Sequence, residues 1–231
     1  MASKPLPPKS YGVLLFPGFQ SLDVFGPLDA LNILSGQTPL SLSILARTLD
    51  PVSTAHIYQV NFSQSIVPTH TFSNPPTDLE VLLIPGGFGT RDEKETEPVV
   101  EFIKSVYPRL RYVLTVCTGS AILARTGVLD GRRATSNKKA FSWAKSQGPN
   151  VNWVAKARWV VDGNIWTSSG ITAGMDLIYA FIGEMYGEKV AEEIANGSEY
   201  ERHTDPDEDP FAELFGAVDQ MLRVIYREER E

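Results

Sequence analysis

The segment Tyr112–Leu123, "YVLTVCTGSAIL", places an apolar, β-branched run directly before a run of small residues with helical character. Between the two runs lies Cys117, the only cysteine among the 231 residues. A free cysteine is commonly a small buried apolar side chain. At a strand-to-helix turn, however, the dipole of the following helix lowers the pKa of a thiol. The segment therefore predicts a βα unit and leaves two roles open for Cys117, structural or nucleophilic.

The strand-then-helix pattern recurs elsewhere in the chain. The apolar runs at 11–17, "YGVLLFP", and 79–84, "LEVLLI", each precede a segment with helical spacing of leucine or valine. Strands that are apolar throughout and alternate with helices are typical of a mostly parallel sheet covered on both faces. The segment 157–168 instead alternates in polarity about Asp162 and Gly163, which predicts an antiparallel hairpin. The sequence therefore predicts an α/β fold.

The two ends of the chain differ in composition from its middle. Residues 1–9 are rich in Pro and Lys and predict a flexible tail, and residues 10–190 carry the α/β pattern of one domain. Residues 191–231 predict a C-terminal helical extension, packed on the domain or in a dimer interface. Its apolar positions predict an amphipathic helix over 211–231, with Phe211, Leu214, Phe215, Val218, Met221, Leu222 and Ile225 on one face.

Charge and cysteine content narrow the classes of function. The chain has 21 Lys and Arg residues against 28 Asp and Glu residues, a net charge of −7 that does not favour nucleic acid or an anionic membrane as a partner. One cysteine excludes an internal disulfide, and neither a signal peptide nor a membrane-spanning apolar run is evident. We therefore expect a cytoplasmic protein that binds no nucleic acid and no membrane.

Two loops near Cys117 in the predicted sheet carry residues suited to chemistry. Ligands of open parallel sheets bind at the carboxyl ends of the strands, where Asp23 follows the first strand and Gly86 and Gly87 follow the run 79–84. Asp23 is either a helix-start acid, favoured by the helix dipole, or an acid of the site. The glycines either form an ordinary turn or point their amides at a developing anion.

Histidine placement argues against metal chemistry and against a Cys-His dyad. His56, His70 and His203 are the three histidines, and all of them lie outside these loops. Glu199 and His203 have i, i+4 spacing, but a single such pair in an acidic loop is more typical of solvated surface than of a metal site. No metal site is expected.

Four ordered segments together resemble the motifs of one family: "YGVLLFPGFQSLDVFGPLDAL", "VLLIPGGFGTR", "LTVCTGSAILARTGVLDGRRAT" and "GNIWTSSGITAGMDLIYAFI". Over residues 10–190 their order and spacing are similar to those of the ThiJ/PfpI superfamily, which is class I glutamine amidotransferase-like. The resemblance implies a flavodoxin-like three-layer sandwich with a mostly parallel sheet, plus an extra C-terminal helix in this chain, and a homodimer. It also implies that Cys117 is a nucleophile at an elbow and that Asp23 is the acid facing it.

The residues around the cysteine indicate a subgroup. Protease-like members have Cys-His-Gly, whereas this chain has Cys117-Thr118-Gly119. Together with Asp23 and "SGITAGMD", this tripeptide is similar to isonitrile hydratases and to the amidase-like domains of AraC-type regulators. One departure is Asn137, which stands where bacterial members commonly have a histidine.

By this resemblance the expected reaction is hydration of a small-molecule isonitrile to an N-formamide, without a metal or a cofactor. The implied catalytic residues are Cys117, Asp23 and Thr118. The implied anion-stabilising backbone groups are those of Gly86, Gly87 and Thr118. The implied substrate pocket is lined by Phe88, Ile171 and Thr172. Two alternatives stay open. One is a glutathione-independent glyoxalase or a related carbonyl-adduct enzyme, and the other is a non-catalytic module that binds a small molecule or senses redox state through Cys117.

Overall fold

A seven-stranded sheet forms the centre of the computed structural model, which describes residues 6–58, 61–217 and 219. The strand order is β10-β11-β7-β6-β1-β2-β5, and every neighbouring pair except β10 with β11 is parallel. The strand bounds are β1 Ser10–Leu14, β2 Ser41–Ala46, β5 His70–Thr71, β6 Val81–Ile84, β7 Tyr112–Thr115, β10 Trp159–Asp162 and β11 Ile165–Ser168. The predicted mostly parallel α/β sheet and the hairpin about Asp162 and Gly163 are confirmed.

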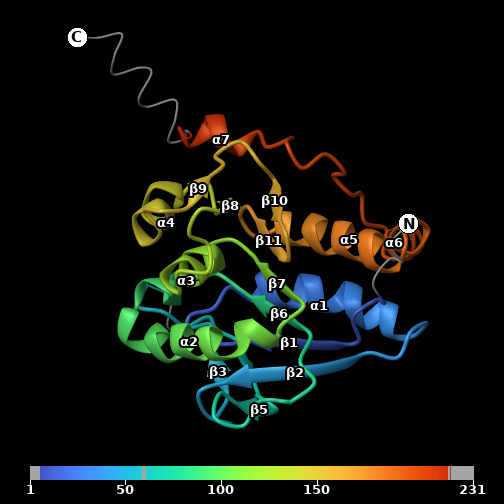
Figure 1. Ribbon diagram of the computed structural model, residues 1–231, viewed down its shortest axis with the longest axis horizontal. Coiled ribbons are helices and arrows are strands. Elements are labelled where there is room, and N and C mark those ends of the chain that lie inside the picture. Colours follow the sequence, from blue (N-terminus) through green and yellow to red (C-terminus); the bar gives the residue numbers. More distant parts are fainter. Residues whose placement is uncertain (1–5, 59–60, 218, 220–231) are drawn as a thin grey trace.

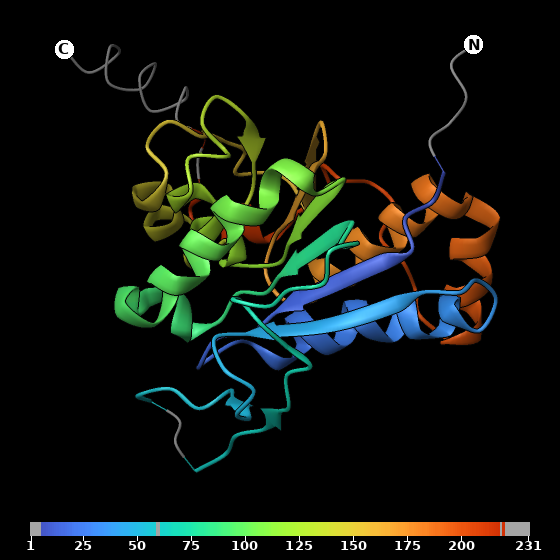
Figure 2. The same cartoon turned by 60° about the horizontal axis from the view of Figure 1, so that its bottom comes forward.

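Helices cover both faces of this sheet and complete the predicted three-layer sandwich (Figures 1 and 2). One layer holds α1, α5 and α6, which contact one another, and the other holds α2 and α3. Their bounds are α1 Ser21–Ser35, α2 Glu93–Val106, α3 Gly119–Arg125, α5 Ala173–Tyr186 and α6 Glu188–Gly197.

Smaller elements lie at the margins of the sandwich. Two small pairs of strands lie there, the antiparallel pair β3 Val52–Ser53 with β4 Ser65–Ile66 and the parallel pair β8 Arg133–Ala134 with β9 Asn152–Trp153. One short helix, α4 Phe141–Gln147, follows α3, and the two 3-10 turns are η1 Phe88–Arg91 and η2 Tyr107–Arg109. The helix α4 packs against α3, next to the end of the sheet where β7 leads into α3.

Hydrophobic patterning accounts for the main elements. All four residues of β6, "VLLI", are buried, as a strand in the middle of a three-layer sandwich requires. In α2, Val99 and Ile103 recur at helical spacing and are buried, while Glu101 and Lys104 form an exposed ion pair at 2.8 Å on the other side. The side chain of Asp92 caps this helix by accepting a hydrogen bond from the amide of Glu95 at 3.1 Å.

After α6 the chain returns across the molecule toward β8 and β9 (Figure 1). We call residues 198–217 the C-terminal arm. The arm contains one short helix, α7 (Phe211–Leu214). The amphipathic helix predicted over 211–231 is wrong for the described residues that follow, because Phe215 and Gly216 form a turn in which Gly216 has a φ of 59°. The rest of that predicted helix lies largely outside the described residues, as does most of the predicted N-terminal tail, and the division of the chain at residues 10 and 190 stays a prediction. Among the residues that the structure describes, no helix is both long enough and apolar enough to cross a bilayer.

Close packing at the start of α3 gives a stability prediction. A Cβ atom on Gly119 would lie 2.3 Å from the backbone oxygen of Ile84, so Gly119→Ala must push α3 away from β6. We expect this change to lower the free energy of unfolding by about 1–3 kcal/mol, measured by chemical denaturation. Gly197→Ala is the matched control, because no atom lies within 4 Å of its added Cβ and α6 tolerates alanine. Equal stabilities of the two variants would contradict this account of the packing.

Candidate active site

Cys117 occupies a strained turn between β7 and α3. Its φ angle is 58°, in the left-handed region that residues with a side chain rarely adopt. Hydrogen bonds hold the turn: the Cys117 amide donates to the Ser169 oxygen at 3.0 Å, and the Cys117 oxygen accepts from the hydroxyls of Ser120 at 3.1 Å and Ser136 at 3.0 Å. Backbone strain of this kind is concentrated at functional sites, and it ends the strand with the thiol at the carboxyl edge of the sheet.

Asp23, in the first turn of α1, lies beside this thiol. Its side chain is fully buried, and its Oδ2 accepts a hydrogen bond from the Gly86 amide at 2.9 Å. Its Oδ1 is also buried, and no described residue lies in hydrogen-bonding geometry to it. Burial raises the pKa of Asp23 to about 7, and the Gly86 amide and the Cys117 thiol partly offset that rise. The carboxyl group is therefore able to gain or lose a proton near neutral pH.

The thiol is less acidic than its place before a helix suggests. Cys117 has 6% of its surface exposed, and burial together with the Asp23 charge raises the pKa of Cys117 to about 12. The amides of Thr118 and Ile171 and the side chain of Asn137 oppose this rise. The expectation that the helix dipole gives a thiolate at neutral pH is therefore wrong, because desolvation in this site outweighs the dipole of the short helix α3.

Asn137 is brought to the thiol by the loop between β8 and α4. Its Oδ1 accepts a hydrogen bond from the Ala140 amide at 3.0 Å, which orients the side chain so that Nδ2 is the group left for Cys117. A Cβ on Gly170 would lie 2.5 Å from this Nδ2, so the glycine leaves room for the amide. The sequence singled out Asn137 only as a departure from a family pattern, and its contact with the thiol is a finding of the structure.

The glycine loop after β6 packs directly on the cysteine turn. A Cβ on Gly86 would lie 2.5 Å from the Thr118 nitrogen and 2.9 Å from the Cys117 Cβ, so only glycine fits there. The Gly87 amide donates to Thr118 Oγ1 at 3.1 Å, and the Thr90 hydroxyl donates to the same oxygen at 3.2 Å. The amides of Gly86 and Gly87, expected to be open toward an anion, are thus occupied by Asp23 and Thr118, and the Thr118 amide is the one at the sulfur.

The three residues expected to line the substrate pocket lie in different places. Ile171, with a φ of 44°, brings its amide to the thiol, and the neighbouring Thr172 is exposed at the start of α5. Phe88 is half exposed and stacks on His56, with ring centres 4.5 Å apart. Phe88 and His56 line a cavity of about 690 Å³ whose lining residues do not include Cys117. The structure therefore supports Ile171 as a neighbour of the thiol and places Phe88 beside another cavity.

Arg91 supplies positive charge near the thiol, which no sequence pattern indicated. Its guanidinium lies 4.5 Å from the ring centre of Trp143 and 5.2 Å from that of Phe88. Burial lowers the pKa of Arg91, and the charge of Cys117 opposes this effect. Within the described part of the chain, no carboxylate forms an ion pair with Arg91. The arginine is thus held by aromatic stacking and by weak hydrogen bonds to the Gly87 oxygen and Thr90 Oγ1, both at 3.4 Å, and its charge interacts with the sulfur.

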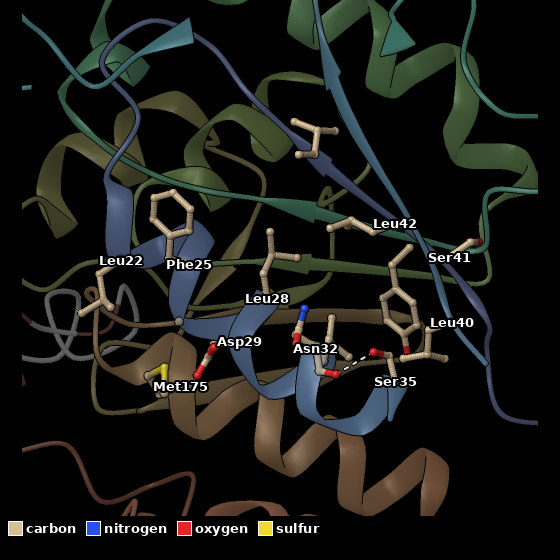
Figure 3. A pocket seen from close by; sticks show the side chains of 14 residues that line it. Leu22, Phe25, Leu28, Asp29, Asn32, Ser35, Leu40, Ser41, Leu42 and Met175 are labelled. Carbon is tan, nitrogen blue, oxygen red and sulfur yellow. Dashed lines mark hydrogen bonds between the residues drawn. The ribbon is translucent and has the colours of Figure 1, made fainter. Parts of the chain in front are cut away.

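A second cavity, of about 650 Å³, lies between α1 and the strands β1 and β2 (Figure 3). Its rim carries the apolar side chains of Leu22, Phe25 and Leu42, all at least partly exposed, and Met175 closes one side. Its lining is mostly apolar and contains neither a cysteine nor a histidine, and its polar members are Asp29, Asn32, Ser35 and Ser41. Across residues 6–58, 61–217 and 219, no group of three or more His, Cys, Asp or Glu side chains is arranged to hold a metal ion.

Comparison with known proteins finds relatives that match most of the chain. The chain is 36% identical to an isonitrile hydratase of Pseudomonas putida over 191 residues, which is 82% of this chain and 77% of that protein. It is 28% identical to an HTH-type transcriptional regulator of Pseudomonas aeruginosa over 94% of this chain and 59% of the regulator. A deglycase of Pyrococcus abyssi is 35% identical over 47% of this chain and 61% of the deglycase. These relatives include both enzymes and regulators.

A solved structure and a family match give the same result. The crystal structure of a ThiJ/PfpI family protein from Pseudomonas syringae superimposes with a TM-score of 0.74 at 29% identity, covering 96% of this chain and 88% of that one. Residues 9–184 match the DJ-1/PfpI family, a span that contains Asp23, the glycine loop and Cys117. The chain is therefore a member of the DJ-1/PfpI family.

Proposed function

We propose that the protein hydrates isonitriles to N-formamides, with Cys117 as the nucleophile and Asp23 as the proton carrier, and without a metal or a cofactor. The observation that carries this proposal is a single buried thiol on a strained turn beside a carboxyl group whose pKa is raised to about 7. The 36% identity to an isonitrile hydratase over most of both chains supports the choice of reaction.

In the first step, the Asp23 carboxylate takes the proton of the Cys117 thiol while the sulfur attacks the terminal carbon of R–N≡C. Asp23 then gives that proton to the same carbon. A C–S bond and a C–H bond form, and the product is a thioimidate, R–N=CH–S–Cys117. A carboxyl group with a pKa near 7 is suited to both halves of this transfer at neutral pH.

In the second step, water adds to the thioimidate carbon. Asp23 accepts a proton from the water, the hydroxyl adds to carbon and the proton passes to nitrogen, giving R–NH–CH(OH)–S–Cys117. Collapse of this intermediate breaks the C–S bond, and the hydroxyl proton passes through Asp23 to the sulfur. The products are R–NH–CHO and the free thiol, so the cycle consumes one water and needs no redox partner.

The remaining residues of the site stabilise charge on the sulfur. The amides of Thr118 and Ile171 and the side chain of Asn137 favour the ionised thiol, and the Arg91 guanidinium acts in the same sense from a greater distance. The Thr118 hydroxyl is held by Gly87 and Thr90, so its role is to fix the glycine loop against the elbow.

A glyoxalase or deglycase reaction is the second candidate, and the deglycase relatives make it worth testing. Among the described residues, the groups that act on the thiol are Asp23, Thr118, Ile171, Asn137 and, through its charge, Arg91, and none of them is a histidine. Rearrangement of a carbonyl adduct favours a second proton-transfer group beside the thiol, which an asparagine does not supply. A non-catalytic small-molecule-binding or redox-sensing module is the third candidate.

We further expect a cytoplasmic homodimer, as the family resemblance implies. The apolar rim formed by Leu22 and Phe25 of α1 and Leu42 of β2 supports association of two copies, since exposed apolar side chains gather there.

The reaction itself gives the first functional prediction. Purified protein mixed with cyclohexyl isocyanide or aryl isocyanides should form the matching formamide, detected by mass spectrometry, without added metal or cofactor. Cys117→Ala and Cys117→Ser should abolish turnover and leave the melting temperature nearly unchanged. Lactate formed from methylglyoxal, with no formamide from any isocyanide, would move the assignment to the glyoxalase branch. Inactivity toward all substrates would favour a binding or sensing module.

The Asp23–Cys117 pair gives a pH prediction. The pair holds two protons at low pH, and the first leaves near pH 7 because burial raises the pKa of Asp23 to about 7. The reactive form holds one proton, so kcat/KM should rise as the pH passes upward through about 7 and fall only at strongly alkaline pH, where Cys117, with its pKa raised to about 12, ionises. The measurement is the pH dependence of isocyanide hydration.

Variants at two aspartates of α1 test this assignment. Asp23→Asn carries no proton, so it should lower kcat by about two orders of magnitude and remove the rise near pH 7. Asp29→Asn removes an exposed carboxylate from the same helix and should leave the rate and the profile unchanged. A wild-type rate in Asp23→Asn would show that Asp23 is only a structural acid at the helix start.

A further inference from the structure

A buried ion pair connects the C-terminal arm to the loop that contacts Cys117. Lys138 Nζ lies 3.3 Å from Asp209 Oδ2, and the two side chains have 1% and 0% of their surface exposed. Removing one member of such a pair leaves the other charge buried and uncompensated, which is costly. The pair therefore holds the arm and the loop together firmly.

The Lys138 ammonium also organises the loop itself. It donates to Thr135 Oγ1 at 2.6 Å, to the Ala157 oxygen at 2.8 Å and, more weakly, to the Ser136 oxygen at 3.4 Å. Thr135 and Ser136 lie just before Lys138 in the chain, and Ala157 lies just before β10. With Asp209 in place, the ammonium is surrounded by oxygen atoms, and residues 135–138 have a fixed conformation.

This same loop touches the cysteine at two points. The Ser136 hydroxyl donates to the Cys117 backbone oxygen at 3.0 Å, and the Asn137 side chain forms a hydrogen bond that favours the ionised thiol. Ser136 and Asn137 directly precede Lys138, so a displacement of the ammonium moves both contacts.

Asp209 lies beyond residue 184, where the match to the family ends. Its Oδ1 accepts a hydrogen bond from the Phe211 amide at 2.8 Å, which fixes its orientation on the arm. The arm is anchored independently: Asp176 accepts from the Tyr200 hydroxyl at 2.8 Å and the His203 amide at 2.9 Å, and the Arg158 amide donates to the Pro206 oxygen at 2.6 Å. The segment that follows the family domain is thus built into the site.

We propose that Asp209 is a positioning residue for Cys117, acting through Lys138 to hold Asn137 against the thiol. This proposal concerns the same thiol as the proposed function but does not require that the substrate be an isonitrile. The charged groups that face Lys138 are Asp209 and Asp219, and the Asp219 side chain accepts a hydrogen bond from the Ala155 amide at 2.5 Å. The nearest aromatic group is the Phe141 ring, 5.4 Å from Nζ.

The test measures the reactivity of Cys117 directly. Because Cys117 is the only thiol, its alkylation by iodoacetamide is followed by intact mass, without any isonitrile substrate, at a fixed pH of about 7.5, which is below the pKa of about 8 to which burial lowers Lys138. The rate reports the fraction of thiolate, so losing the Asn137 hydrogen bond should slow it. We expect Asn137→Ala to slow alkylation by about tenfold, the effect of one unit of thiol pKa, and Asp209→Asn by several-fold. Failure to hydrate isonitriles would not affect this measurement.

Two comparisons separate positioning from general loosening of the fold. A loosened fold exposes the thiol and speeds alkylation, so a faster rate in Asp209→Asn would overturn the proposal. The double variant of Asp209→Asn with Asn137→Ala should be no slower than Asn137→Ala alone, and additive effects would also overturn it. Asp207→Asn, at an exposed site on the same arm, is the control and should alkylate at the wild-type rate.

A second variant keeps the test decisive if Asp209→Asn does not fold. The double change Lys138→Met with Asp209→Leu replaces the buried pair by apolar side chains, which buried sites commonly tolerate. It should also slow alkylation, because the loop loses its ammonium anchor. A wild-type rate in a folded Lys138→Met, Asp209→Leu protein would show that the pair has no effect on Cys117.

Discussion

The contact between the buried Asp23 carboxyl group and the Cys117 thiol is the constraint around which the rest of the site is arranged. Burial disfavours the charged form of both groups, and the Asp23 charge further raises the pKa of Cys117, whereas the hydrogen bond with the thiol partly lowers the pKa of Asp23. Because the folded pKa of Asp23 is raised, the folded state binds this proton more tightly than the unfolded chain does. The resulting stabilisation is present at low pH and is lost as the pH rises toward 7. The fold is thus most stable when the carboxyl group is protonated, whereas the proposed chemistry begins with the carboxylate.

Sheet order explains how the two groups meet. The strand β6 lies between β1 and β7, so the loop after β6 lies between the loops that carry Asp23 and Cys117. Gly86, in that middle loop, donates its amide to Asp23 and leaves no space for a Cβ against the cysteine turn. The parallel sheet therefore brings an acid, a glycine and a thiol to one edge, although 94 positions separate Asp23 from Cys117, the difference of their residue numbers.

Local patterns in the sequence were sufficient to predict the parallel sheet and the hairpin about Asp162, because both depend on apolar runs and turn residues. The rule that parallel strands end at one edge placed Asp23 and Cys117 at the same edge, and the family resemblance implied that the two face each other. The direction of the thiol pKa shift was mispredicted, since burial depends on every layer packed around the turn. Asn137 and Arg91 reach the site by long-range packing that no local spacing encodes. The Lys138–Asp209 pair was equally hidden, because an acidic, proline-rich segment such as 199–210 is typical of a solvated loop.

The stacking of Arg91 on Trp143 has an optical consequence. The other tryptophans, Trp153, Trp159 and Trp166, are buried in the core, and among the described residues only Trp143 has a guanidinium over its ring. The arginine charge acts on Cys117, so a change of charge at the sulfur alters the electric field at an indole that is partly open to solvent. Trp143 is therefore an intrinsic fluorophore linked to the thiol through Arg91, and we expect its emission to change with the charge on the sulfur.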